Sequence, residues 1–350
     1  MAEKRPYSRY PLMDFRILTS PIIDVRSPIE FNQGHWPGAI NIPLFSNKER
    51  ELIGKSYKKE GQLKAIFNGL KVTVPNIQKL INLIIEITSQ QDQSNKSLRI
   101  YCWRGGMRSK AVAWLARRNG IKTYLLKDGY KSYRKWVLSQ FEADLPIRLL
   151  GGKTGTGKTE ILKSMNSKAI FVIDLEGLAN HRGSSFGSLG MEQQPTTQQF
   201  ENIIAEQIDI YFKSSSLEIW LEAESSYLGK CRIPNNLYKK MKNAPILEII
   251  KTEKERIDNL VNVYSQNPKN ELKDAVNRIS KRLGPIRTKD ALTAIDKSEW
   301  PKACKAMLDY YDRCYDYELK KTTKLNSVNL SGLNLKLSLE KILNENLYTL

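Results

Sequence analysis

The chain has 350 residues, 41 % of them hydrophobic and 9 % aromatic, which is typical of folded rather than disordered proteins. Lysine and arginine number 56 against 37 acidic residues, a formal net charge of +19 that favours a polyanionic partner such as RNA or DNA. No apolar run could span a bilayer and the N-terminal stretch lacks the apolar core of a signal peptide, so we expect a cytoplasmic location.

The first 140 residues alternate short apolar runs with amphipathic stretches. Strands are predicted at residues 21–25, 38–43, 97–102 and 123–129, and helices at 77–88 and 109–120. Alternating strands and helices imply a mostly parallel sheet that helices cover on both faces. We therefore predict a first α/β domain over residues 1–140.

A second α/β domain is predicted over residues 146–350. Its first strand begins at Pro146 and runs into a glycine-rich turn and a helix, and further strands are predicted at 171–177, 217–224 and 245–251. The pattern is then helical to about residue 321 and ends with a short strand and a helix. This predicts a second parallel sheet of the P-loop NTPase type with a helical extension.

The segment GKTGTGKT, residues 152–159, fits the phosphate-binding pattern G-x-x-x-x-G-K-[ST] between a strand and a helix. Gly152, Gly155 and Gly157 allow the backbone N–H groups to point inward, and Lys158 adds a positive charge. Thr159 can ligate Mg²⁺. The loop predicts phosphate binding without identifying the molecule that carries the phosphate.

The segment YCWRGGMRS, residues 101–109, places Cys102 and Arg108 at C-x5-R spacing before a predicted helix. Two chemistries fit this spacing, a cysteine phosphatase and a thiol that carries sulfur or selenium. The helix dipole, the loop N–H groups, Arg104 and Arg108 all stabilise a thiolate, so we expect a reactive cysteine. Tyr101 replaces the histidine of many phosphatases and no general-acid loop is evident, which argues against the phosphatase.

The other three cysteines form no C-x2-C pair, and the chain has only two histidines. We therefore expect free thiols and no dedicated metal site.

Residues 22–43, IIDVRSPIEFNQGHWPGAINIP, resemble the rhodanese domain through Asp24, Arg26, Glu30 and the segment 34–43. The resemblance covers roughly residues 15–138 and implies sulfur transfer through a persulfide on Cys102. The active loop is one residue longer than the commonest rhodanese loop. The longer loop suggests a bulkier, phosphate-sized anion.

A rhodanese domain joined to a phosphate-binding loop resembles the tRNA 2-selenouridine synthase family. The matching segments are 102–109, 128–136, 174–187, 220–234, 278–284 and 310–321. The resemblance implies a transferase acting on 2-thiouridine at the wobble position of tRNAs for Lys, Glu and Gln. It implies S-geranylation by geranyl diphosphate at the phosphate loop, followed by exchange for selenium from selenophosphate. Cys102 would carry a perselenide or bind selenophosphate. No permanently bound cofactor is expected, and the requirement for Mg²⁺ stays open.

Polar residues predicted near the carboxyl edge of the second sheet are candidates for lining a substrate site. They are Asp174, which closes a predicted strand, His181, Arg182 and Ser184 in the following loop, and Glu222 and Glu224 after the next strand. The two glutamates occupy the usual place of a metal-associated acid. His181 is a candidate for proton transfer, and Arg182 for contact with a diphosphate or tRNA phosphate.

Arg278, Lys281 and Arg282 fall on one face of a predicted helix and are candidates for contact with the tRNA backbone. The tyrosines at 310, 311, 315 and 317 are interpreted as packing residues rather than base-stacking ones. One alternative function is a P-loop ATPase or kinase with a regulatory rhodanese module. Another is a non-catalytic tRNA-binding protein with vestigial loops, against which the intact Cys102, Gly157, Lys158 and Thr159 argue.

Overall fold

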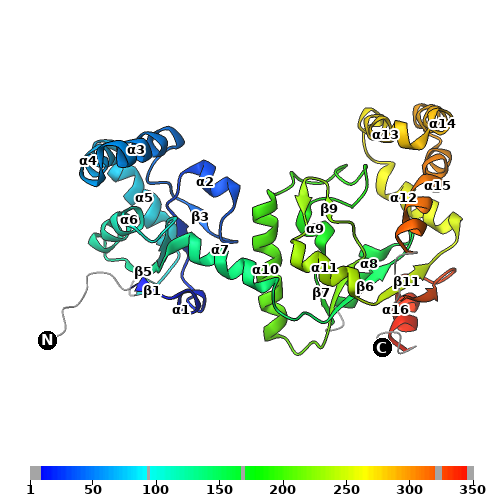
Figure 1. The fold of residues 1–350 in the computed structure, drawn as a ribbon, viewed down its shortest axis with the longest axis horizontal. Helices are drawn as coiled ribbons and strands as arrows, with labels where there is room; N and C mark the ends of the chain where they lie inside the picture. The colour runs from blue at the N-terminus through cyan, green and yellow to red at the C-terminus, as the bar shows by residue number, and fades with distance from the viewer. Residues whose placement is uncertain (1–8, 93–94, 167–169, 320–324, 345–350) are drawn as a thin grey trace. The chain divides into compact units, whose positions relative to one another are not determined.

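The computed structural model describes residues 9–92, 95–166, 170–319 and 325–344 (Figure 1). The chain divides into two compact units, an N-terminal unit, Met1–Ser139, and a C-terminal unit, Gln140–Leu350. Each unit is built on a five-stranded sheet in which every described strand pair is parallel. This confirms the predicted α/β class. The described helices include none long and apolar enough to cross a membrane.

The N-terminal sheet has the strand order β1-β5-β4-β2-β3. Its strands are β1 (Arg9–Tyr10), β2 (Ile22–Asp24), β3 (Ile40–Asn41), β4 (Ser97–Tyr101) and β5 (Lys122–Leu126). Its helices are α1 (Leu12–Arg16), α2 (Pro28–Gln33), α3 (Asn47–Glu60), α4 (Gln62–Thr73), η1 (Val74–Asn76), α5 (Ile77–Thr88), α6 (Met107–Arg118) and α7 (Gly129–Gln140). The predicted helix at 77–88 is therefore confirmed at both ends.

Alternate residues of β4 face opposite layers, as the period of a strand requires. Leu98 and Ile100 belong to an aliphatic core with residues of α5 and α6. Tyr101 points the other way and stacks with Tyr130 of α7, their ring centroids 6.0 Å apart. The central strand is thus buried on both faces, and its end is held rigidly where Cys102 follows.

The C-terminal sheet has the strand order β12-β11-β6-β8-β7. Its strands are β6 (Ile147–Gly151), β7 (Phe171–Val172), β8 (Ile219–Glu222), β11 (Ile246–Ile250) and β12 (Leu325–Asn329). Helices α8 (Lys158–Asn166) and α16 (Leu335–Asn344) pack on one face of this sheet through an aliphatic core. The unit also contains α9 (Leu175–Ala179), α10 (Thr197–Lys213) and α11 (Asn235–Asn243).

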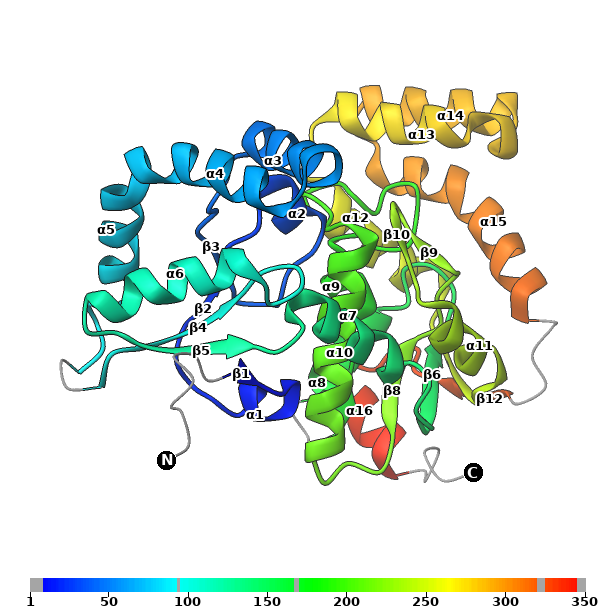
Figure 2. The ribbon, with the colours of Figure 1, turned by 60° about the vertical axis from the view of Figure 1, so that its left-hand side comes forward.

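Four helices separate β11 from β12 and form the predicted helical extension. They are α12 (Glu253–Tyr264), α13 (Lys269–Leu283), α14 (Pro285–Asp296) and α15 (Trp300–Leu319). Figure 2 shows α13 and α14 side by side with α15 beneath them. Since β11 and β12 are neighbours in the sheet, the extension leaves the sheet and returns to it at adjacent positions.

Two features of the C-terminal unit differ from the predictions. The predicted strand at 171–177 is shorter, because β7 ends at Val172 and Asp174 instead caps α9 by accepting a hydrogen bond from the Gly177 N–H (2.8 Å). A short antiparallel hairpin, β9 (Tyr227–Leu228) with β10 (Cys231–Arg232), was not predicted.

Candidate functional site

Cys102 lies in the loop between β4 and α6, with 2 % of its surface exposed. Its Sγ accepts a hydrogen bond from the Gly106 N–H (3.3 Å) and lies 3.3 Å from the Ser109 Oγ. Since Gly106 and Ser109 stand at the start of α6, the sulfur is directed at the positive end of the helix dipole. The sequence predicted this position of the thiol at the start of a helix, and the reactivity of Cys102 stays a prediction.

The conformation of the cysteine loop depends on a glycine at the start of α7. The Tyr130 N–H donates to the Cys102 carbonyl (2.8 Å), which joins the loop to α7. Gly129 has φ +59°, and a Cβ at that position would lie 2.2 Å from the same carbonyl oxygen. Only glycine therefore fits here, and the cysteine loop and the turn after β5 form one interlocked structure.

The two arginines of the cysteine loop have different surroundings. Arg108 pairs with Glu30 of α2, with its Nη1 2.7 Å from Oε2. Burial acts to raise the pKa of Glu30, but the hydrogen bonds and charge of Arg108 outweigh it and lower that pKa overall. Arg104 is exposed. Arg104 is therefore accessible to solvent, whereas Arg108 links the loop to α2.

The rhodanese-type residues Asp24 and Arg26 form a buried ion pair rather than a second reactive centre. The Arg26 Nη2 lies 2.6 Å from the Asp24 Oδ2 and also donates to the Gly34 carbonyl (2.8 Å). Its guanidinium lies 3.8 Å from the ring centroid of Tyr130. A buried and fully bonded pair of this kind fixes β2, the segment around Gly34 and α7 together.

The phosphate loop joins β6 to α8 in the C-terminal unit. Gly152, Gly155 and Gly157 have φ values of +148°, +86° and +82°, which side-chain-bearing residues rarely adopt. The Lys158 Nζ donates to the Gly152 carbonyl (2.9 Å) and lies 3.5 Å from the Glu222 Oε1. The amine therefore crosses the mouth of the loop, where a phosphate oxygen can replace one of these contacts.

Three carboxyl groups gather beside the loop. One ligand oxygen from each of Glu176, Glu222 and Glu224 lies within 4.8 Å of the other two. The Thr159 Oγ1 is 3.2 Å from an oxygen of Glu176 and 3.2 Å from one of Glu222. A hydroxyl has only one proton to donate, so either the two carboxylates share it or one of the carboxyl groups carries a proton of its own.

The pKa values of the cluster fit that arrangement. Burial, followed by the charges of Glu222 and Glu224, raises the pKa of Glu176. Burial raises the pKa of Glu222, and burial with the charge of Glu222 raises that of Glu224. A divalent cation would remove this repulsion, and oxygen ligands of this kind suit Mg²⁺. Thr159 and the three glutamates can therefore hold Mg²⁺ next to a bound phosphate.

Glu222 and Glu224 were predicted as metal-associated acids, whereas Glu176 was missed. Residues 171–177 were interpreted as one strand, which hid the fact that Glu176 lies on the short helix α9. Its position two residues after Asp174, at the end of an apolar run, was the available signal.

The loop after α9 begins beside this cluster, because the His181 N–H donates to the Glu176 carbonyl (3.0 Å). Gly183 packs against the cluster, since a Cβ there would lie 2.7 Å from the Glu224 Oε2. His181 is 8 % exposed, and its Nδ1 has no hydrogen-bond partner among the described residues. Burial, then the charge of Arg278, lowers the pKa of His181, so the imidazole is neutral near pH 7. Arg182 uses its Nη1 to bind the Leu189 carbonyl (2.9 Å).

The remaining predicted residues have mainly structural contacts. Asp174 caps α9 and lies 3.7 Å from the Lys163 Nζ instead of joining the carboxyl cluster. Ser184 accepts from the Phe186 N–H (3.2 Å). Arg278 of α13 donates to the Ser185 carbonyl (2.9 Å), which connects the extension to this loop.

The basic face of α13 is solvent-accessible, because Arg278, Lys281 and Arg282 are all exposed. Tyr310 and Tyr311 pack against the core of the extension, as the sequence indicated. Tyr317 is 64 % exposed, so the packing interpretation fails for that residue.

Two family profiles match the two units of this chain. A family profile described as "tRNA 2-selenouridine synthase AAA domain" matches residues 145–337, and one described as "Rhodanese-like domain" matches residues 12–135. A solved N-terminal domain from Clostridium difficile 630 aligns at 34 % identity over 37 % of this chain and 99 % of that one, with a TM-score of 0.35.

Two curated relatives extend over most of the chain. The tRNA 2-selenouridine synthase of a Sulfurovum species is 33 % identical over 88 % of this chain and 92 % of that protein. The tRNA 2-selenouridine synthase of Marinobacter nauticus is 34 % identical over 85 % of this chain and 88 % of that protein. The chain therefore belongs to the tRNA 2-selenouridine synthase family, in which its N-terminal unit is the rhodanese domain and its C-terminal unit the AAA domain.

Proposed function

We propose that the enzyme converts wobble 2-thiouridine to 2-selenouridine through an S-geranyl intermediate, in the tRNAs for Lys, Glu and Gln. Geranyl diphosphate binds the phosphate loop and selenophosphate supplies selenium at Cys102. The observation that carries this proposal is the presence of two complete but chemically different sites in one chain. One is a buried thiol under helix N–H groups, and the other is a phosphate cradle with its own lysine.

In the first step the thiouridine sulfur attacks C1 of the geranyl group. The C1–S bond forms, the C1–O bond breaks with its electrons going to the diphosphate, and the base loses its N3 proton. Lys158 and the loop N–H groups stabilise the charge that develops on the leaving diphosphate. His181, which is neutral near pH 7 because of its lowered pKa, is the proposed acceptor of the proton. Mg²⁺ held by Thr159 and the glutamates would neutralise the diphosphate further.

In the second step a selenide equivalent from selenophosphate adds to C2 of the base. The C2–Se bond forms, the C2–S bond breaks, and geranylthiol leaves with a proton while N3 is reprotonated. Hydrolysis of the P–Se bond releases phosphate. Cys102 supports this step by binding selenophosphate beside Arg104. A perselenide on Cys102 would need a two-electron oxidant, because the selenium of selenophosphate is already at the selenide level. Alkylation in the first step matters chemically, because it allows sulfur to leave as a neutral thiol.

Analysis of nucleosides from tRNA treated with the purified full-length enzyme tests this division of labour. With both co-substrates present, Cys102→Ala should accumulate S-geranyl-2-thiouridine and form no 2-selenouridine. Lys158→Ala should form neither product above a trace, because the alkylation step fails. Matched controls are Cys314→Ala, an exposed cysteine, and Lys213→Ala, an exposed lysine paired within its own helix.

Equal loss of both products in the two variants would contradict the proposed sequence of steps. If the wild-type enzyme hydrolyses ATP and leaves the tRNA unchanged, the proposed function is wrong and the ATPase alternative is correct. Contact of tRNA with Arg278, Lys281 and Arg282 belongs to the same proposal, because their exposed face suits a phosphate backbone.

A further inference from the structure

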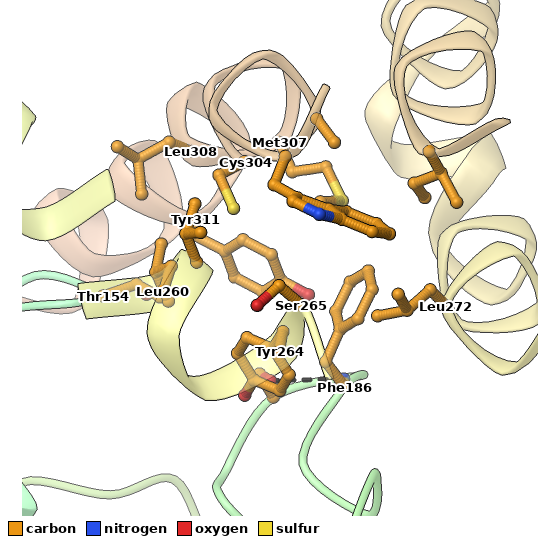
Figure 3. A pocket seen from close by; sticks show the side chains of 15 residues that line it. Thr154, Phe186, Leu260, Tyr264, Ser265, Leu272, Cys304, Met307, Leu308 and Tyr311 are labelled. Atoms are coloured by element: carbon orange, nitrogen blue, oxygen red, sulfur yellow. Dashed lines mark hydrogen bonds between the residues drawn. The ribbon is translucent and has the colours of Figure 1, made fainter. Parts of the chain in front are cut away.

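An apolar pocket adjoins the phosphate loop (Figure 3). The loop residue Thr154 forms part of its wall, together with Leu260 of α12, Phe186, Trp300 and Met307. The space between its walls, counted together with the open solvent at its mouth, is about 600 Å³. None of the described residues that line it is charged, although the chain as a whole carries +19. The pocket is therefore suited to an apolar group rather than to an ion.

The pocket and the phosphate loop share a wall. Besides Thr154, which belongs to both, Gly155 packs directly on α12, since a Cβ there would lie 2.6 Å from the Arg256 carbonyl and 3.1 Å from the Leu260 Cγ. The Asn259 Nδ2 donates to the Gly155 carbonyl (2.9 Å). A ligand with an anionic head on the loop can thus extend an attached group into the pocket.

Leu272 and the phosphate-loop residue Thr154 line opposite sides of the pocket. In Figure 3, Thr154 and Leu260 lie on one side and Leu272 of α13 on the opposite side, with Phe186 and Met307 between them. Leu272 therefore forms part of the end distant from the phosphate loop. This arrangement favours a chain that enters beside the loop and ends at α13.

The chemistry of the walls separates a hydrocarbon from a nucleobase. Rings of Phe186, Tyr264, Trp300 and Tyr311 contribute to the lining. The polar side-chain groups of the lining residues are hydroxyls, the indole N–H of Trp300 and the thiol of Cys304. A base carries several donors and acceptors, and burying them without partners is costly. A branched, unsaturated hydrocarbon loses no hydrogen bonds in this pocket and gains contact with the aromatic faces.

We propose that this pocket holds the hydrocarbon chain of an isoprenoid diphosphate whose head group binds the phosphate loop, and that Leu272 limits the length of that chain. The inference rests on the proposed function, since it concerns the same co-substrate, and adds the residues that select it.

Cys304 provides a probe in the unmodified enzyme, because it lines the pocket and is partly accessible. The rate of its alkylation by N-ethylmaleimide can be followed by mass spectrometry, with the exposed Cys314 as an internal control. Geranyl diphosphate at 10 times its Kd leaves about one site in eleven free, so it should slow alkylation of Cys304 by about tenfold. Inorganic diphosphate, which has the head group alone, should leave the rate unchanged, and Cys314 should react equally in all samples.

Chain-length preference provides the second measurement. Leu272→Ala should raise the ratio of kcat/KM for farnesyl over geranyl diphosphate by about tenfold or more, because it opens the distal end. Leu237→Ala removes a side chain that is equally buried but lies on α11, outside the pocket, and should leave the ratio unchanged.

The outcomes separate this inference from the proposed function. If the wild-type enzyme geranylates tRNA while Cys304 stays as reactive as in the free protein, the chain subsite is refuted and the function stands. If geranyl diphosphate shields Cys304 but no geranylated tRNA forms, the subsite stands and the proposed reaction falls. If neither occurs, both are wrong. An unchanged chain-length ratio in Leu272→Ala refutes the role of that residue.

Discussion

Replacement of Arg256 by methionine should weaken the phosphate loop without touching any group that binds phosphate. Arg256 lies on α12 and is 5 % exposed. Its Nε donates to the carbonyl of the loop residue Thr154 (2.9 Å), and its Nη1 donates to the Asp312 Oδ2 of α15 (3.0 Å). Methionine retains most of the apolar stem but removes the charge and the donors, so Thr154 loses a partner and Asp312 loses its counter-charge.

The size of the effect follows from these contacts. Removing one partner from a buried ion pair costs about 3–5 kcal/mol, since the other charge is left unpaired. The side chain of Asp312 is 23 % exposed, so water relieves part of this cost. We therefore expect a loss near the lower limit, about 3 kcal/mol. If half of it acts on the loop, the affinity for diphosphate falls about tenfold.

Two measurements on the full-length enzyme test this reasoning. Hydrogen exchange followed by mass spectrometry should show faster exchange in peptides covering β6, the loop and α8, and calorimetric titration should show the weaker binding of inorganic diphosphate. Arg313→Met is the matched control, because Arg313 is exposed on α15 and donates to the Asp309 carbonyl of the same helix. If the exchange rates and the Kd of Arg256→Met stay within about twofold of the wild-type values, Arg256 does not stabilise the phosphate loop.

Three further predictions concern the other sites. Glu30→Gln should lower the free energy of unfolding by about 1–3 kcal/mol at neutral pH. The folded-state pKa of Glu30 lies below its usual 4.5. The difference in unfolding free energy between wild type and variant should therefore be largest above pH 4.5 and should vanish as the pH falls through the lowered pKa. Urea titrations at a series of pH values measure it. Gly129→Ala should distort the cysteine loop and abolish selenium transfer while S-geranylation persists, measured by nucleoside analysis; normal 2-selenouridine formation would contradict the interlock. Mg²⁺ at 100 times its Kd should stabilise the wild-type enzyme by about 2.7 kcal/mol but not Glu222→Gln, measured by thermal unfolding; an equal shift in both would exclude the carboxyl cluster as the site.

The fold was predictable from the sequence where elements are long or fully buried. The predicted helix at 77–88 coincides with α5, and the strands around residues 97–101, 147–151 and 246–250 stand where apolar runs occur. The prediction fails at Asp174, which caps a helix instead of continuing a strand. The sequence did not reveal this, because an apolar run followed by acidic residues is also typical of the end of a strand. The hairpin β9–β10 was missed since two-residue strands carry too little periodicity.

The candidate site divides in the same way. The phosphate loop and the cysteine loop are contiguous in sequence, so their residue types reveal them directly. Glu176 lies beside Glu222 and Glu224 only because α9 and the end of β8 are close in space. The residues that line the apolar pocket are spread over the sequence from Thr154 to Tyr311. Contacts between such distant positions leave no local pattern. The sequence also cannot show that Arg108 is occupied by Glu30 whereas Arg104 is exposed.

The helical extension is anchored at both ends to neighbouring strands, β11 and β12, which pair in register from Ile246 with Leu325 to Ile250 with Asn329. The pairing of β11 with β12 fixes where the extension begins and ends, whatever its own sequence is. The sequence of such an insertion can therefore diverge between homologues, and the whole insertion can be replaced by that of a homologue. Grafting the α12–α15 segment of a relative with a different prenyl preference, while keeping Arg256 and Asp312, would therefore transfer that preference without rebuilding the phosphate cradle.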